Sequence, residues 1–274
     1  MPLHLNSITN DSQNRDVLTW LLYNAIHEST GAFITENKRY SHLTNLIRDQ
    51  RTGKTIGRFV FTLFQNEAEK RMEVLDLDIV LDNPNATDLQ YIRMLPGSSD
   101  SNEYHEVEVV GDEQHLLIET VNRYVIDGKI AGTNQSVHVS AFPFELSVYE
   151  NMDALNTWAG FDRLGEIGNT GLRVNGFSEH FTAPGSVFSR KNGDSKFSFI
   201  VGIVDSYEDV TIKLGNNTFD FVVIWLDTAL GIIPVAAGRE VFDLEGLATG
   251  KVVAMNADIK TDFADYSVWH WQKA

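Results

Sequence analysis

The sequence predicts a mainly β protein of the α+β class. Segments that alternate apolar and polar residues with a period of two occur along most of the chain, whereas helical periodicity is confined to two short stretches. Turn residues separate the alternating segments, as antiparallel strands require. With 274 residues, of which 43% are hydrophobic, the chain can bury a substantial core. We therefore expect antiparallel sheets with few helices.

The N-terminal part begins with a predicted helix at 12–28. One apolar stripe with helical spacing defines this helix and consists of Val17, Leu18, Leu21, Leu22 and Ala25. Asn10 or Asp11 can cap its start, and Gly31 lies just beyond its end. A helix with a single apolar stripe is expected to pack on a sheet.

Strands are predicted to follow this helix. Residues 59–64 and 74–81 alternate with a period of two, which predicts a strand pair with one buried face and one partly solvated face. The turn residues at 82–85 end the second strand. Three more strands are predicted, at 106–110, 116–125 and 137–148. Pro143 indicates that the last of them is an edge strand or is bent.

A second helix is predicted near 150–159, and a glycine-rich segment follows it. Five glycines fall within 17 positions, at Gly160, Gly165, Gly168, Gly171 and Gly176. We interpret 161–194 as a connection, because glycine-rich segments without periodicity are typical of boundaries. The sequence therefore predicts an α+β domain at 1–160 and a second domain at 195–274.

The second domain has the clearest strand pattern. Strands are predicted at 197–204, 210–214, 219–226, 232–236 and 251–259, with a hairpin turn at 215–217 and a short helical turn at 240–247. This order, with Gly202 inside the first strand, resembles the OB fold, a five-stranded Greek-key barrel. The resemblance covers roughly 195–265 and implies an OB-like β-barrel. It rests on the order of elements.

The charge of the chain disfavours nucleic acid and membranes as partners. The formal net charge is −16, because 38 acidic residues outnumber 22 basic ones. Single-stranded nucleic acid could still stack on barrel aromatics such as Tyr207 and Trp225. However, only six basic residues face eleven acidic ones from 195 to 274. One strand face with a period of two, interpreted as the inner face of a barrel strand and hence as core, carries Phe219, Phe221, Val223 and Trp225.

The sequence also predicts a cytoplasmic protein without redox chemistry. It contains no cysteine, which excludes disulfides, thiolate metal sites and cysteine nucleophiles. Residues 1–6 lack the basic and apolar regions of a secretory signal. No stretch reaches the roughly 20 apolar residues of a membrane-spanning helix.

No catalytic motif stands out. The metal-protease, serine-hydrolase, phosphate-loop and dinucleotide-binding patterns are all absent from the sequence. Asp76 and Asp78 share one strand face and would suit a hard cation or an acid–base pair, but carboxylates on a solvated strand face are the more common interpretation. We expect no metal and no cofactor.

These patterns favour a protein-interaction or accessory module over an enzyme. The C-terminal Trp269 and Trp271 would pack on the other half of the chain or on a second subunit, so a protein partner or self-association is expected. The alternative is a small-molecule or metal-dependent enzyme or binder. Its composite site would lie between the halves, where His180 would meet Asp76 and Asp78.

Overall fold

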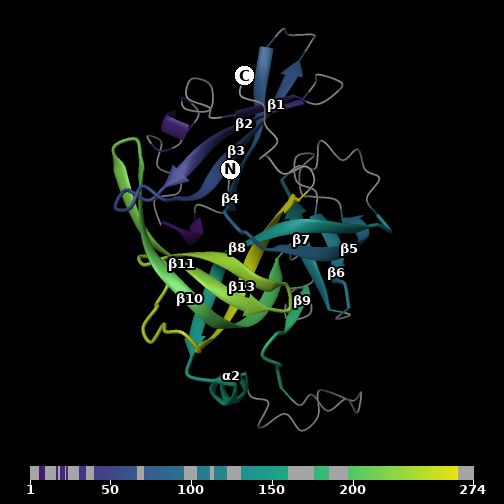
Figure 1. Cartoon of the computed structure of the whole chain (residues 1–274), viewed down its shortest axis with the longest axis vertical. Helices are drawn as coiled ribbons and strands as arrows, with labels where there is room; N and C mark the ends of the chain where they lie inside the picture. The colour runs from purple at the N-terminus through teal and green to yellow at the C-terminus, as the bar shows by residue number, and fades with distance from the viewer. Residues whose placement is uncertain are drawn as a thin grey trace.

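Strands dominate the protein and form two sheets (Figure 1). The computed structural model describes residues 6–9, 17, 19–21, 23, 31–34, 40–66, 71–95, 104–111, 114–121, 131–159, 176–184 and 197–264. Within these residues the mainly β class with few helices is confirmed.

The smaller sheet is antiparallel and has the strand order β1-β2-β3-β4. Its strands are β1 (Gly31–Ile34), β2 (Tyr40–Arg48), β3 (Thr55–Asn66) and β4 (Arg71–Leu81). The predicted strand pair at 59–64 and 74–81 corresponds to β3 and β4. The sequence therefore predicted two of the four strands of this sheet.

The larger sheet is mixed, with the order β11-β12-β8-β5-β6-β7-β13-β10-β9. Its strands are β5 (Ala86–Leu95), β6 (Tyr104–Val109), β7 (His115–Thr120), β8 (Asn134–Tyr149), β9 (Thr182–Pro184), β10 (Ser198–Leu214), β11 (Asn217–Thr228), β12 (Gly231–Gly238) and β13 (Val252–Phe263). The helix α2 (Met152–Trp158) follows β8 as predicted. Its N-cap residue Asn151 accepts a hydrogen bond from the N–H of Ala154 at 2.9 Å.

Five strands of the larger sheet close into a ring. The pairings β10–β11 and β8–β13 complete the circuit β8-β12-β11-β10-β13. β10 allows this closure because its first half pairs with β13 and its second half with β11. Gly202 lies in the first half, where a Cβ atom would come within 2.5 Å of the carbonyl oxygen of Asp227. The strand can pass this close to β11 only because the residue is glycine.

The fifth strand of the ring comes from outside the segment 195–265. Four ring strands, β10 to β13, fall within that segment, whereas β8 precedes the predicted connection at 161–194. β8 also supplies the one parallel contact of the ring, between Ala141 and Val235 of β12. The division of the chain into two domains stays a prediction, but the ring includes strands from both sides of that division.

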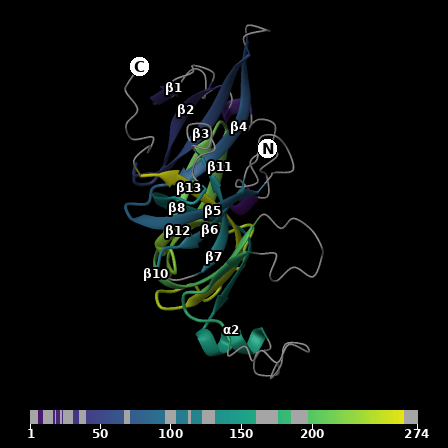
Figure 2. The same cartoon turned by 90° about the vertical axis from the view of Figure 1, so that its right-hand side faces the viewer.

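The smaller sheet packs over the outside of the β10–β11 hairpin, and α2 lies at the opposite end of the ring (Figures 1 and 2). Phe59 and Phe61 of β3 share a buried cluster with Phe219 and Phe221 of β11. Leu21 joins this cluster from the predicted N-terminal helix, of which residues 17, 19–21 and 23 are described and helical. The other faces of the ring strands fill its apolar interior.

The structure corrects several expectations about the elements. Both faces of the β3–β4 pair are buried, because Val60 and Thr62 are as enclosed as Phe59 and Phe61. Residues 240–247 form turns instead of a helix. The strands β1, β2, β5 and β9 were not predicted, and β9 lies within the predicted connection at 161–194. Within β5 only Leu89 and Tyr91 are buried, so the apolar alternation that would have revealed the strand is weak.

Gly202 provides a test of ring closure. Replacing Gly202 with valine should lower the free energy of unfolding by roughly 2 kcal/mol or more, because the side chain would collide with the backbone of β11. Urea unfolding measures this change. The matched variant Ser206→Val, at an exposed position of the same strand, should change stability by less than about 0.5 kcal/mol. Equal stability of the two variants would show that the close approach at Gly202 is not needed.

Candidate functional site

A buried lysine lies where the two sheets meet. Lys260 of β13 is 0% exposed. Its ammonium donates a hydrogen bond to Oδ1 of Asp78 on β4 at 2.7 Å and another to Oε2 of Glu119 on β7. Asp78, only 2% exposed, belongs to the smaller sheet, whereas Lys260 and Glu119 belong to the larger one. One cation therefore links the two sheets.

Strand register explains this arrangement. Lys260 pairs with Glu119 in the parallel pairing of β13 with β7, so their side chains are neighbours. Ile259 and Phe263 of β13 point into the ring core, which leaves the alternate residues of β13 on its outer side, toward β4. A buried ammonium without a partner is strongly unfavourable, so the fold depends on these carboxylates to satisfy it.

A second ion pair extends the arrangement. Arg58 of β3 donates a hydrogen bond to Oδ2 of Asp262, which lies two residues beyond Lys260 on the same face of β13. Nη1 of Arg58 also lies 3.9 Å from Oδ1 of Asp82. The residues that join the sheets through these ion pairs form the junction cluster, which consists of Arg58, Asp78, Glu119, Lys260 and Asp262. It contains two basic and three acidic residues, so the acidic side chains outnumber the basic ones.

The junction cluster changes the interpretation of Asp76 and Asp78. The solvated-face interpretation is wrong for Asp78, which is buried because β13 and β7 cover this side of β4. Among the described residues, carboxylate oxygens of Asp76, Asp78 and Glu119 lie within 4.8 Å of one another. Such a set can hold a hard cation. Here the ammonium of Lys260 already neutralises charge on Asp78 and Glu119. That the protein binds no metal stays a prediction.

Burial alters the acidity of the cluster and its neighbours. Burial raises the pKa of Asp78, and the nearby Lys260 offsets this increase only in part. Burial likewise raises the pKa of Asp258 to about 6, against the lowering effect of Lys260. Burial alone would lower the pKa of Lys260, but Asp78 and Glu119 outweigh it and raise that pKa. Lys260 therefore remains charged, while Asp78 and Asp258 hold their protons more tightly than usual.

A groove opens along the second half of β8, near α2. Its volume is about 460 Å³, within the range of ligand-binding clefts. One border is formed by β8 from Phe144 to Tyr149, and another by residues 241–243, which follow β12. Phe199 of β10 and residues 254–256 of β13 also line it. Among the described residues, no strand pairs with β8 on the β12 side after Ala141. The border at 241–243 therefore places one side of the groove next to an unpaired strand edge.

Exposed aromatic side chains and carboxylates line this groove. Trp158 of α2 is 69% exposed and Phe144 is 44% exposed. The rings of Trp158 and Tyr149 have centroids 5.7 Å apart. Glu145 and Asp243 contribute carboxylates, and no lysine or arginine is among the described lining residues. Large exposed aromatic residues beside an open groove are typical of binding surfaces.

The other predicted site residues lie apart from these two features. His180 does not join the junction cluster, because its Nε2 atom lies 3.4 Å from Oδ2 of Asp227. Tyr207 is exposed on β10, and Trp225 packs at the margin of the core between the sheets. Trp269 and Trp271 lie outside the described residues.

The prediction that the β11 aromatics belong to the core is correct for Phe219 and Phe221, but the predicted face is wrong. Phe219, Phe221 and Val223 do not line the interior of the ring; they are buried on its outer face, against the smaller sheet. Oligonucleotide-binding OB barrels use the face of their second and third strands, which β11 and β12 would provide. Because the smaller sheet occupies part of that face, the structure gives no support to base stacking on these side chains.

No known family model matches the chain, and comparisons with curated proteins and with solved structures found no match. Among the described residues, none of the helices has the length and hydropathy needed to cross a membrane. The functional proposals therefore depend on the geometry of the groove, the junction cluster and the cavities.

The raised pKa of Asp258 predicts a pH-dependent stability. In the folded protein this carboxyl group keeps its proton up to about pH 6, whereas the unfolded chain releases it near the ordinary value of 3.8. The stability that proton binding contributes is therefore present at low pH and lost as the pH rises through 6. Asp258→Asn should reduce the loss of stability between about pH 5 and about pH 8 by about 1 kcal/mol, measured by urea unfolding. The exposed control Asp88→Asn should keep the wild-type profile. Identical profiles for all three proteins would contradict the role of Asp258.

Proposed function

We propose that the protein is an interaction module that binds an extended peptide segment of a partner protein. The segment adds as a strand to the free edge of β8 and places side chains in the adjacent groove. The observation that carries this proposal is the coincidence of an unpaired edge and an aromatic groove on the same stretch of β8. Main-chain hydrogen bonds would provide affinity, and the groove would provide specificity.

The strand edge supports this mode of binding. β8 is 16 residues long, and β13 pairs with it from Val137 to Tyr149 on one side. On the other side β5 and β12 pair only with its first half. Pro143 lies opposite a register shift between Asn256 and Ala257 of β13, where the strand is irregular. After Pro143, the N–H and C=O groups on the outer edge of β8 can form hydrogen bonds with another strand.

The groove determines which peptides fit. Trp158 and Phe144 would contact apolar side chains, because both expose large aromatic surfaces. Glu145 and Asp243 would attract lysine or arginine, and the net charge of −16 would favour the approach of a basic partner. A segment that alternates basic and apolar residues therefore suits this edge best.

The ring supports a description as an OB-like barrel. Its features in common with that fold are five strands, a parallel contact between two of them, and a long strand with an internal glycine that pairs on both sides. In this proposal β8 takes the place of the fifth strand but precedes the other four in the chain.

We place the module in the cytoplasm, as the cysteine-free sequence indicates.

The proposal predicts that Trp158 is needed for peptide binding. The probe is a fluorescent peptide of about six residues that alternates lysine and valine. It should bind the full chain saturably in an anisotropy titration, and Trp158→Ala should weaken binding by about tenfold or more. Tyr207→Ala, which removes an exposed aromatic ring from β10, should leave the affinity unchanged.

Two matched peptides test the mode of binding. Replacing the lysines with glutamates should abolish binding, because the groove carries only acidic charge among its described lining residues. Methylating alternate backbone nitrogens on the edge-facing side should also abolish it, because strand addition needs those N–H groups. If the methylated peptide binds as tightly as the parent, or Tyr207→Ala is as harmful as Trp158→Ala, strand addition at this edge is refuted.

A further inference from the structure

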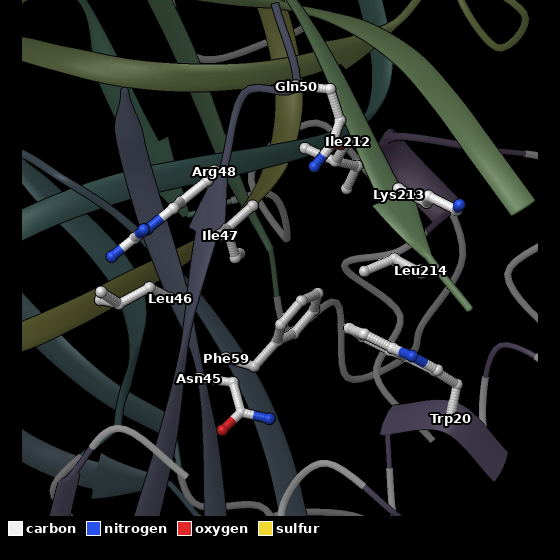
Figure 3. Close-up of a pocket in the computed structure, with 10 residues that line it drawn as sticks. All are labelled: Trp20, Asn45, Leu46, Ile47, Arg48, Gln50, Phe59, Ile212, Lys213 and Leu214. Atoms are coloured by element: carbon white, nitrogen blue, oxygen red, sulfur yellow. The ribbon is translucent and has the colours of Figure 1, made fainter. Parts of the chain in front are cut away.

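A second cavity lies between the two sheets, away from the peptide groove. It has a volume of about 300 Å³ and is bordered by β2, β3, the end of β10 and the helical residue Trp20 (Figure 3). Trp20, Phe59, Ile212 and Leu214 point toward its centre. Arg48 and Lys213 point away from that space. The cavity therefore has two aromatic and several aliphatic walls, as small-molecule sites typically do.

Hydrogen bonds between the sheets fix one border of the cavity. The N–H of Gln50 donates to the carbonyl oxygen of Thr211 at 2.8 Å, and the N–H of Thr211 donates to Oδ1 of Asp49 at 3.0 Å. Burial acts to raise the pKa of Asp49, but hydrogen bonds from Thr52, Thr211 and Arg51 outweigh it and lower that pKa to about 2. Asp49 is therefore a charged acceptor at neutral pH. These hydrogen bonds fix the residues that follow β2 against β10. The two sheets are therefore held together at this border of the cavity.

One buried polar group borders the cavity without a complete set of partners. Asn45 of β2 is only 7% exposed, and its Oδ1 atom has no hydrogen-bond partner among the described residues. Asn45 pairs with Phe59 across β2 and β3, so both side chains lie on the same face of the sheet. A buried amide oxygen without a partner is unfavourable. The carboxamide can supply a donor and an acceptor side by side to a ligand.

We propose that this cavity binds a small planar heteroaromatic molecule of the purine class. The ring would lie against Trp20 and Phe59, because aromatic walls favour flat ligands. The carboxamide of Asn45 would pair with an adjacent donor and acceptor on the edge of the ring, the pattern by which asparagine recognises adenine. A free base suits the cavity because about 300 Å³ lies at the lower end of the range for ligand sites.

Binding of adenine to the full chain tests this proposal. Isothermal titration calorimetry should give one saturable site for adenine and a clearly weaker affinity for purine, which has the same rings without the exocyclic amine. Asn45→Leu should weaken adenine binding by about tenfold, because two hydrogen bonds are lost, and should affect purine less. Arg48→Met is the matched control, because this side chain points away from the cavity, and it should bind adenine as the wild type does.

Two further variants keep the test decisive. If Asn45→Leu does not fold, Leu214→Trp should fill the cavity and abolish adenine binding, whereas Trp158→Ala should leave it unchanged. An absence of saturable adenine binding to the wild type would overturn the proposal. Equal affinities for adenine and purine, or unchanged adenine binding in Leu214→Trp, would overturn it as well.

Discussion

The buried ammonium of Lys260 is the constraint on which the arrangement of the two sheets depends. Lys260 is fully enclosed, so water cannot solvate its charge, and its two hydrogen-bonded carboxylates come from different sheets. If the smaller sheet moved away from β13, the ammonium of Lys260 would lose its hydrogen bond to Asp78. Buried ion pairs add little net stability compared with apolar packing, but a broken one is costly. We therefore regard the junction cluster as the feature that selects one docking geometry.

Docking of the smaller sheet also determines which surfaces remain for binding. One face of the β3–β4 pair packs its phenylalanines against β11, and the other face contributes Asp78 and Arg58 to the junction cluster. The outer face of β11 is thereby covered. The second half of β8, next to α2, stays accessible at the far end of the ring (Figure 1). The proposed purine site is a consequence of this docking, whereas the groove of the proposed peptide site contains no described residue of the smaller sheet.

The local pattern of the sequence was sufficient to predict most strands but not what covers them. Alternation predicted β3, β4, β6 to β8 and the ring strands after 195, and it placed Asp76 and Asp78 on one face. It could not show that this face is buried, because the covering residue Lys260 lies 182 positions from Asp78 in the sequence. An acidic–basic alternation at 258–262, within an otherwise apolar strand, was the available signal for the cluster. The groove depends on where β12 stops beside β8, which is a tertiary property that no single segment encodes.

The most direct test of the central role of Lys260 is the unfolding free energy of Lys260→Met. Removing the ammonium should destabilise the protein by about 3–5 kcal/mol or prevent folding, because Asp78 and Glu119 would be left buried and uncompensated. The double variant with Asp78→Asn should recover part of this loss, since it removes one of the stranded charges. The partly exposed Lys251, paired with Glu150, is the control, and Lys251→Met should cost less than about 1 kcal/mol. Wild-type stability of Lys260→Met would contradict the claim that this lysine joins the two sheets.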